Sequence, residues 1–382
     1  MRARLTMVLA SVLSICLSAC QPPTTKLGRL SPEQIKSEQL KQQQLVIRSD
    51  IDQHKRLDDV AHPLFKAAVP LCGSFVQSRS GIRFANIHSY SREYAEAARG
   101  LGFSDTIMVV SIARGSAAEA AGLRVGDRIT SISGRPAPSG RTALRDLAAR
   151  LTPPARRGAS GASSLQARIV FGLRRASDST PVSTGPQDLE LSITADTVCA
   201  YGAAVARDKE LNAWADGTNI VITTAMMRFA AREDELAVVV AHEIAHNAMR
   251  HIDAKKKNAT FGALLGAILD VAAATQGVNT GGEFTSQGAQ LGAMTFSQDF
   301  EREADHVGMY ILARADHRTT TAADFWRRMA QESPGSIKFA SSHPTTAERY
   351  LRLEQAAAEI EGKRAAGQPL LPELKVEPAR RQ

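Results

Sequence analysis

The sequence has 382 residues, of which 43% are hydrophobic and 23% charged, so it excludes a disordered chain and is typical of about two folded domains. The net charge of +8 arises from basic residues scattered among acidic ones, and aromatic residues make up only 5% of the chain. Because nucleic-acid sites combine basic patches with interleaved aromatics, no nucleic-acid partner is expected.

The first 20 residues are typical of an export signal. Arg2 and Arg4 precede an apolar run that is too short for a membrane-spanning helix. The run ends in Leu17-Ser18-Ala19-Cys20, which resembles a bacterial lipobox and implies cleavage before Cys20 and lipidation of its thiol. An ordinary secretory signal with an incidental cysteine is the alternative.

The expected organisation of this end is therefore a signal peptide at 1–19 and a short tether at 20–30. Gln21 follows the cysteine, and the resemblance to enteric lipoproteins then favours the outer membrane. We expect a periplasmic protein that is held on the membrane by its lipid.

A long helix is predicted in residues 31–72. Ser31 is a suitable cap and Pro32 a suitable first residue. Its apolar stripe is too irregular for a coiled coil, which favours packing against a domain. Cys72 and Cys199 are the cysteines left after the signal, and in an exported protein they can form a disulfide. Two isolated buried thiols are the alternative.

Residues 73–197 contain short strands and turns with a distinctive centre. The run from Gly115 to Ile129, GSAAEAAGLRVGDRI, closely resembles a PDZ domain. The resemblance implies a groove that binds an extended peptide, with a C-terminal peptide as a possible ligand. Gly100-Leu101-Gly102-Phe103 spells the carboxylate-loop motif of that family, but too few residues separate it from the next strand. Ser80-Gly81-Ile82-Arg83-Phe84 is the better candidate for the loop.

The next segment predicts two short strands and the start of a helix. Asp216-Gly217 is a tight-turn signal between Leu211 and the predicted strand at 219–224. A helix at 225–231 then leads to acidic residues that suit the first turn of a further helix.

That further helix contains His242-Glu243-Ile244-Ala245-His246 among apolar neighbours. Residues four apart lie on one helix face, so His242 and His246 can bind one metal ion. Glu243 lies beside the open coordination position and can take a proton from water there. A surface helix with an incidental match is the alternative, but buried histidines and glutamates need partners.

Residues 255–295 are rich in glycine and alanine, with an apolar face from Phe261 to Leu269. Asp270 and the short length argue against a membrane span. Three interpretations of residues 258–295 remain open: a core helical hairpin, a mobile lid over the metal, and a surface that touches membrane or a partner.

A third metal ligand lies downstream. Glu301 and Asp305 are four residues apart and share a helix face, whereas Glu303 projects elsewhere. Glu301 can complete the site, and Asp305 can accept the second N–H of a ligand histidine. His251 is a competing ligand, but the three-histidine pattern requires histidine where Ile252 stands.

With these motifs in place, residues 200–353 resemble the HtpX and CAAX-prenyl-protease family of zinc metallopeptidases, in its soluble periplasmic branch. The resemblance implies one Zn²⁺ per chain and makes the PDZ domain an insertion. It implies substrate contacts from Asn212 and Ala213 and from an edge strand that includes Ile220 and Ile222. It also matches His343, which would stabilise an oxyanion or act as an inhibitory ligand, and Arg349. Gln298, where many relatives have arginine, departs from the pattern.

We therefore expect an α+β protein with a mainly helical peptidase domain at 198–362, a small edge β-sheet, and a flexible tail at 363–382. The expected activity is hydrolysis of peptide bonds in exported or envelope proteins, with unfolded or misassembled envelope proteins as substrates. The alternative is a periplasmic chaperone or assembly factor with a normally autoinhibited metal site. A cell-wall amidase is less consistent, because an edge strand suits a peptide backbone.

Overall fold

The computed structural model describes residues 24–25, 28–151, 167–176, 186–276, 278–295, 297–332 and 347–374. Residues 1–43 form one unit and residues 44–382 a second one. Helices and small sheets alternate along the chain, which confirms the predicted α+β class.

The first described helix is α2 (Pro32–Ala67), and it begins where the sequence predicts. The backbone amide of Gln34 donates to Ser31 Oγ at 3.2 Å, and Gln34 Oε1 accepts from the Ser31 amide at 2.8 Å, forming a capping box. From Ile47 onward one side of the helix is buried. Leu57, Leu64 and other residues of that side belong to the same core as the downstream helices.

A two-stranded neck separates the inserted domain from the rest. Strand β1 (Val76–Arg79) follows the short helix η1 (Val69–Leu71) and pairs antiparallel with β8 (Asp196–Cys199). A disulfide joins Cys72 to Cys199 across a sequence separation of 127 residues, with the Cα atoms 5.9 Å apart. The chain therefore enters and leaves the insertion at one point.

The insertion is built on a sheet in the order β2-β3-β4-β6-β7. Its apolar centre includes Ile107, Phe171 and Leu173, which are fully buried. The bounds are β2 (Ile82–Ala85), β3 (Met108–Ile112), β4 (Arg128–Ile132), β5 (Arg135–Pro136), β6 (Arg168–Arg175), β7 (Gln187–Thr194), η2 (Ile87–Ser89), η3 (Arg92–Tyr94), α3 (Ala95–Gly100), α4 (Ala117–Ala120) and α5 (Ala143–Leu151). Gly100 ends α3, so the sequence from Gly100 to Phe103 is no carboxylate loop, in agreement with the sequence argument.

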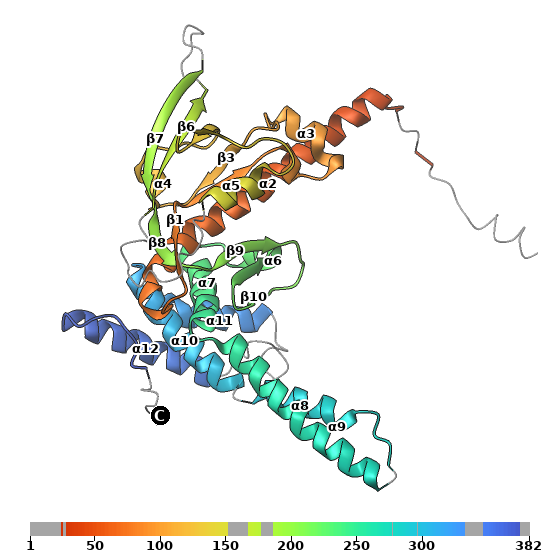
Figure 1. Ribbon diagram of the computed structural model, residues 1–382, viewed down its shortest axis with the longest axis vertical. Helices are drawn as coiled ribbons and strands as arrows, with labels where there is room; N and C mark the ends of the chain where they lie inside the picture. Colours follow the sequence, from red (N-terminus) through yellow and green to blue (C-terminus); the bar gives the residue numbers. More distant parts are fainter. Residues whose placement is uncertain are drawn as a thin grey trace, which may run out of the picture. The chain divides into compact units, whose positions relative to one another are not determined.

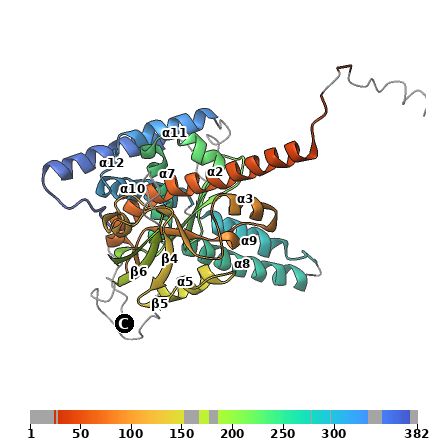
Figure 2. The ribbon, with the colours of Figure 1, turned by 90° about the horizontal axis from the view of Figure 1, so that it is seen from above.

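The last part of the chain packs helices around α7 (Glu233–Ala248). Figure 1 and Figure 2 show α10 and α11 beside it. The other elements are β9 (Gly202–Ala206), β10 (Ala213–Ala215), β11 (Asn219–Thr223), α6 (Thr224–Phe229), α8 (His251–Thr275), α9 (Glu283–Met294), α10 (Ser297–Arg314), α11 (Thr321–Glu332) and α12 (Ala347–Ala365).

The order of the small sheet contradicts the prediction that the strand with Ile220 and Ile222 is an edge strand. Its order is β10-β11-β9, so β11 is the central strand and pairs on both sides. Ile220 and Ile222 on β11 are fully buried in the core, so neither side chain can contact a substrate. The turn at Asp216-Gly217 places β10 beside β11, so β10 is an edge strand of this sheet. Strand order depends on contacts between distant segments, which the local pattern does not contain.

The prediction that residues 258–295 form a core helical hairpin is wrong. Only His251 and Gly266 are buried in α8, and no residue is buried among the described side chains of α9. The two helices contact each other over their length.

The prediction of a flexible tail at 363–382 is wrong for the first part of this range. Helix α12 runs to Ala365, and Lys363 Nζ donates to the carbonyl of Leu371 at 3.0 Å. Leu370 and Leu371 pack against the peptidase core, because their apolar side chains cover its edge. Residues 375–382 lie outside the described residues.

Candidate metal centre

Helix α7 forms the buried wall of the site. Every residue from Glu235 to Asn247 is buried, and the run of alanines and valines before His242 fills the space between neighbouring helices. The helix begins with three acids, and Glu235 Oε2 accepts from the Arg232 amide at 3.2 Å. The helix axis and the direction of the histidines are therefore fixed by packing on all sides.

His242, His246 and Glu301 come together in this buried region. Their ligand atoms all lie within 4.8 Å of one another. The two Nε2 atoms are 3.1 Å apart, and the Glu301 oxygens lie 3.3 Å from His242 Nε2 and 3.4 Å from His246 Nε2. Glu243, between the histidines in sequence, is 2% exposed. Three buried donor atoms that face each other suit a bound cation.

Glu301 reaches α7 because helix α10 lies close to it. Gly308 of α10 faces the backbone of Ala241 and His242, and a Cβ atom at Gly308 would lie 3.3 Å from the His242 amide nitrogen. A side chain there would require the two helices to shift by a few tenths of an ångström. The glycine thus allows the approach that brings the two halves of the cluster together.

The orientation of His242 is set by Asp305, as the sequence predicts. Asp305 Oδ1 lies 2.9 Å from His242 Nδ1, which leaves Nε2 for the centre of the cluster. Arg349 in turn donates two hydrogen bonds to Asp305, at 2.8 Å and 2.7 Å. Its guanidinium also lies 3.6 Å from the ring centroid of Trp326, whose ring is in an edge contact with His242. The Asp305–Arg349 pair is buried, so it holds His242 rigidly.

A second pair orients His246, and sequence reasoning missed it. His251 Nδ1 lies 3.0 Å from His246 Nδ1, and His251 Nε2 lies 2.8 Å from Glu303 Oε2. If His251 donates to Glu303, its Nδ1 accepts from His246, and the Nε2 lone pair of His246 faces the cluster. The signal for it in the sequence is a histidine five residues after His246, His251, which can orient His246 as well as compete as a metal ligand.

The pKa values of the two histidines are shifted in opposite directions. Burial lowers the pKa of His242, but hydrogen bonds to Asp305 and Glu301 outweigh it and raise the pKa to about 9. Burial lowers the pKa of His246 to about 4. Burial would also raise the pKa of Asp305, yet Arg349 and His242 hold it below its ordinary value. A cation bound to His242 therefore competes with a proton.

The edge strand β10 is joined to the end of α7. The Gly217 amide donates to Asn247 Oδ1 at 2.8 Å, and Asn247 Nδ2 donates to the Asn219 carbonyl at 3.2 Å. Asn247 directly follows His246, so the β10–β11 turn has a fixed position next to the metal helix. Asn212 and Ala213 lie at the start of β10. Ala213 is buried and Asn212 half-buried, so contacts with a peptide would involve the backbone.

The insertion carries a cavity of 480 Å³. It lies along β2, the edge strand of the sheet, and is closed on the other side by α5. The end of α2 forms a third wall. Its lining includes Ser80, Gly81 and Phe84 from the predicted carboxylate loop and strand, Leu147 from α5, and His62 and Phe65 from α2. The predicted loop thus lies at the groove, and the groove borders a helix of the peptidase core.

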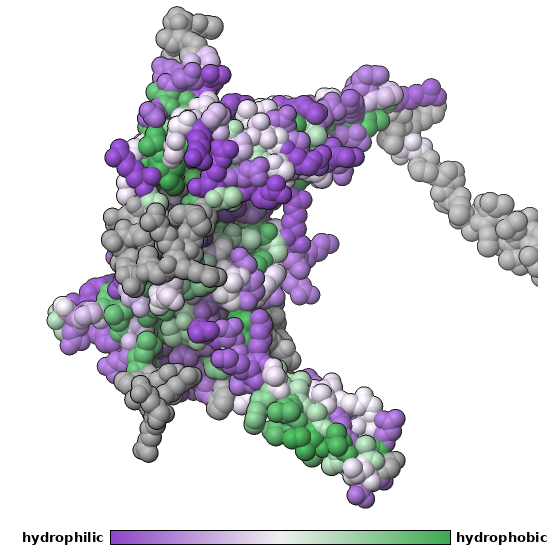
Figure 3. All heavy atoms as spheres, viewed as in Figure 1, coloured by the Kyte–Doolittle hydropathy of each residue, from purple (hydrophilic) through white to green (hydrophobic). Residues whose placement is uncertain are grey.

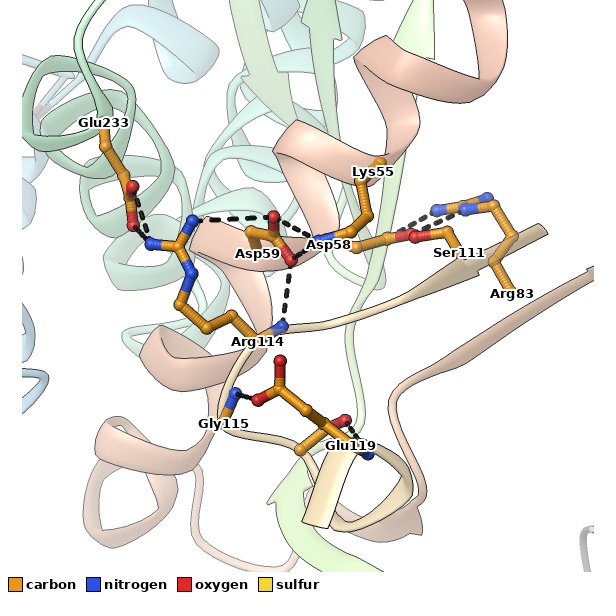
Figure 4. Close-up of polar contacts among 10 residues, drawn as sticks. Lys55, Asp58, Asp59, Arg83, Ser111, Arg114, Gly115, Glu119 and Glu233 are labelled. Atoms are coloured by element: carbon orange, nitrogen blue, oxygen red, sulfur yellow. Dashed lines mark hydrogen bonds and ion pairs between the residues drawn. The ribbon is translucent and has the colours of Figure 1, made fainter. Parts of the chain in front are cut away.

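Polar contacts join this groove region to α2 and α7 (Figure 4). Arg83 of β2 donates two hydrogen bonds to Asp58, at 2.8 Å and 2.7 Å. Arg114 donates to Glu233 of α7 at 2.6 Å and 2.8 Å, and its amide donates to Asp59 Oδ1 at 2.9 Å. The insertion is therefore held against the metal-bearing domain by charged groups from two helices.

Two predicted residues are not placed. Cys20 and His343 lie outside the described residues, so the structure adds nothing on lipidation or on the late histidine.

The buried cluster of two histidines and one glutamate on two packed helices is typical of a metallopeptidase domain, and the inserted sheet with its edge groove is typical of a peptide-binding module. Residues 194–357 match Peptidase family M48, and residues 108–152 match the PDZ domain family. The chain therefore contains a peptidase domain of family M48, preceded in the sequence by a PDZ domain, and the family implies a metal ion.

Three relatives show the extent of this similarity. The beta-barrel assembly-enhancing protease of Yersinia pestis is 34% identical over 136 residues, which cover 34% of this chain and 28% of the relative. The protease of the same name from Escherichia coli (strain K12) is 31% identical over 131 residues, covering 32% and 27%. The mitochondrial metalloendopeptidase OMA1 of Schizosaccharomyces pombe is 30% identical over 165 residues, covering 42% and 48%. The matches span less than half of the length of each of these relatives.

Proposed function

We propose that the protein is a zinc-dependent endopeptidase that hydrolyses peptide bonds of exported or envelope proteins. The observation that carries the proposal is the convergence of His242, His246 and Glu301 beside Glu243 on a buried helix. The names of the relatives, which are proteases and a metalloendopeptidase, support the same reaction class.

The donor set fits one Zn²⁺ per chain. Ligands at about 2.0–2.1 Å from a tetrahedral zinc ion lie roughly 3.3 Å apart. The three separations in the cluster are 3.1, 3.3 and 3.4 Å. Two imidazole nitrogens and a carboxylate are also the ligands of zinc sites that keep one position open for water.

A bound zinc ion would supply an electrophile for the scissile carbonyl and acidify water. Glu243 would take a proton from the water that attacks the carbonyl carbon and give it to the amine nitrogen as the C–N bond breaks. Asp305 and His251 keep the histidine rings in the tautomer that presents Nε2. His343 either stabilises the oxyanion or acts as an inhibitory ligand, as the family resemblance implies.

We further propose that the substrate backbone pairs with the free edge of β10, starting at Asn212 and Ala213. This replaces the central strand β11 as the pairing strand. A peptide strand added to β10 would lie next to the turn that Asn247 ties to α7. Unfolded or misassembled envelope proteins suit this mode, because it needs an extended segment. The PDZ groove would bind a C-terminal peptide.

The proposed location is the periplasm, with a lipid on Cys20 anchoring the chain to a membrane, the outer membrane being favoured. Support comes from the lipobox at Leu17 to Cys20 and from the disulfide between Cys72 and Cys199, which requires an oxidising compartment.

The test is proteolysis of an unfolded outer-membrane protein by Glu243→Gln. Removal of the general base should lower the cleavage rate by ~10²–10⁴-fold while zinc content stays at one per chain. Glu361→Gln, on the exposed face of α12, serves as the matched control and should cleave at the wild-type rate. Full proteolysis by Glu243→Gln with zinc bound would overturn the mechanism.

An inactive wild type and an inactive His343→Ala would favour the chaperone alternative.

A further inference from the structure

The hairpin of α8 and α9 carries its large apolar side chains on the outside. Figure 3 shows hydrophobic residues gathered on its surface. Each of the six residues that follow is between 49% and 65% exposed in α8: Phe261, Leu264, Leu265, Ile268, Leu269 and Val271. A hairpin that is stable in water places such residues between its helices or against a domain.

The interface between the two helices is made of glycine instead. Gly262 and Gly266 of α8 face Gly288 and Gly292 of α9, so that backbone lies against backbone. A Cβ atom at Gly266 would lie 1.9 Å from the Phe284 carbonyl oxygen, and one at Gly288 would lie 2.2 Å from that of Gly262. Glycine inside a helix costs about 1 kcal/mol in water, so four of them need a reason. Close packing through small residues is how helices associate in lipid, where apolar side chains face outward.

Charge is nearly absent from the hairpin. Between residues 258 and 298 the sequence contains two ionisable side chains, Asp270 and Glu283, whereas 23% of the whole chain is charged. Asp270 is satisfied internally: it accepts from the amide and hydroxyl of Thr285, at 2.9 Å and 2.6 Å, and from Thr280. From residue 258 onward, the exposed surface of α8 thus lacks the charges by which surface helices stay soluble.

Positive charge is concentrated at the root of the hairpin instead. Lys255, Lys256 and Lys257 directly precede the apolar run, and the last two are exposed. Cations next to an apolar segment match the phosphate groups that border the hydrocarbon of a membrane. Lysines followed by an exposed apolar face therefore indicate that this surface binds a lipid bilayer with anionic headgroups.

We propose that the outward face of α8 inserts into a lipid bilayer, with Lys256 and Lys257 among the headgroup phosphates. By length and composition α8 is the one described helix that could cross a membrane, which corrects the expectation that this segment is too short. Helix α9, however, has 12 residues, or about 18 Å, against a hydrocarbon core of about 30 Å. It exposes the polar residues Ser286, Gln287 and Gln290 as well as the apolar residues Phe284, Leu291 and Met294. The insertion is therefore shallow, with α8 in one leaflet and the polar side of α9 toward water.

Insertion at a named position can be tested by tryptophan quenching. Leu265→Trp is introduced in the full chain, which is mixed with vesicles of phosphatidylglycerol and phosphatidylethanolamine that contain lipids brominated on the acyl chains. The signal of the parent chain, with Trp214 and Trp326, is subtracted. We expect quenching and a blue shift for Leu265→Trp and neither for Gln290→Trp on the polar side of α9. Equal behaviour of the two variants would overturn the proposal. A lipid on Cys20 acts equally in both.

Partitioning by vesicle flotation tests the energetics. The triple variant Phe261→Ser, Leu265→Ser, Ile268→Ser should bind anionic vesicles at least about tenfold more weakly. Lys256→Gln and Lys257→Gln should each weaken binding about fivefold, an effect that disappears on phosphatidylcholine vesicles. Ser286→Ala with Gln287→Ala is the matched control and should partition like the parent. Circular dichroism checks that all variants keep their helix content.

Two results would assign the surface differently and overturn the proposal. If the triple variant partitions normally but converts an oligomer into a monomer without vesicles, the apolar face binds a second copy of the chain. If it partitions normally but changes the cleavage rate of a soluble peptide, the hairpin is a lid over the metal centre.

Discussion

Helices α7 and α8 follow each other directly in the chain and are both rich in apolar residues, but they use them in opposite ways. In α7 every residue from Glu235 to Asn247 is buried between other helices. In α8 only His251 and Gly266 are buried. Hydropathy alone therefore does not say which apolar helix forms a core. What distinguishes the two is where the large side chains lie: those of α7 are buried against other helices, whereas those of α8 point outward and glycines make its contact with α9.

Removal of the disulfide, whose cysteines belong to the same core as α7, should cause the largest loss of stability. Replacing Cys72 and Cys199 by serine frees a loop of 127 residues, which should lower the free energy of unfolding by roughly 4–5 kcal/mol in the chain-entropy model. Urea unfolding followed by the fluorescence of the buried Trp326 measures it. Reduction of the wild type should reproduce the loss. A change below about 1 kcal/mol would show that the cysteines do not hold this core together.

A matched pair of isoleucines tests the comparison most directly. Ile244 of α7 is fully buried and Ile268 of α8 is 58% exposed. Ile244→Ala should cost about 2–5 kcal/mol of unfolding free energy, because it leaves a cavity. Ile268→Ala should change it by less than about 0.5 kcal/mol in water. Equal costs for the two substitutions would mean that the hairpin is buried in solution, for example by a second copy.

His251 stands at the junction of the two helices, and its substitution should affect the metal rather than the fold. His251→Phe retains the stacking on Phe300 but removes the hydrogen bond to His246. We expect zinc affinity to fall about 10–100-fold, measured by competition with a chelator. Glu303→Gln should have a smaller effect in the same direction. Unchanged affinity in both would leave His246 oriented by packing alone.

The smallest effect should be a pH dependence at the β10–β11 turn. Burial raises the pKa of Asp216, but hydrogen bonds from Asn219 and Thr218 outweigh it and lower the pKa to about 2. Because the folded pKa is depressed, the stabilisation is present above about pH 4 and is lost as the pH falls toward 2. Asp216→Asn should therefore lose less stability than the wild type between pH 6 and pH 3 in urea unfolding. A parallel loss in both would contradict this.

The parts of the site that the sequence predicted are those set by helix periodicity. His242 and His246 share a face, as do Glu301 and Asp305, because residues four apart do so on any helix. The contact that brings the two pairs together was not predictable, but the four residues were. The disulfide partners followed from the compartment and from elimination.

What the sequence could not predict depends on contacts between distant segments. The order of the small sheet placed β11 in the centre, so Ile220 and Ile222 face the core rather than a substrate. The pairing of His251 with Glu303 joins residues 52 positions apart. The outward face of α8 has the same apolar pattern as an inward one, and only the glycine contact reveals the difference.

The neck at Cys72 and Cys199 has a consequence for the integrity of the chain in an environment that contains other proteases. Because the PDZ domain lies wholly between these cysteines, a single cut within it would leave α2 covalently attached to the metal-bearing domain. Such a nicked molecule would run as one species on a non-reducing gel and as two after reduction. The insertion can thus suffer damage, or be exchanged for another binding module, without releasing the helix that completes the peptidase core.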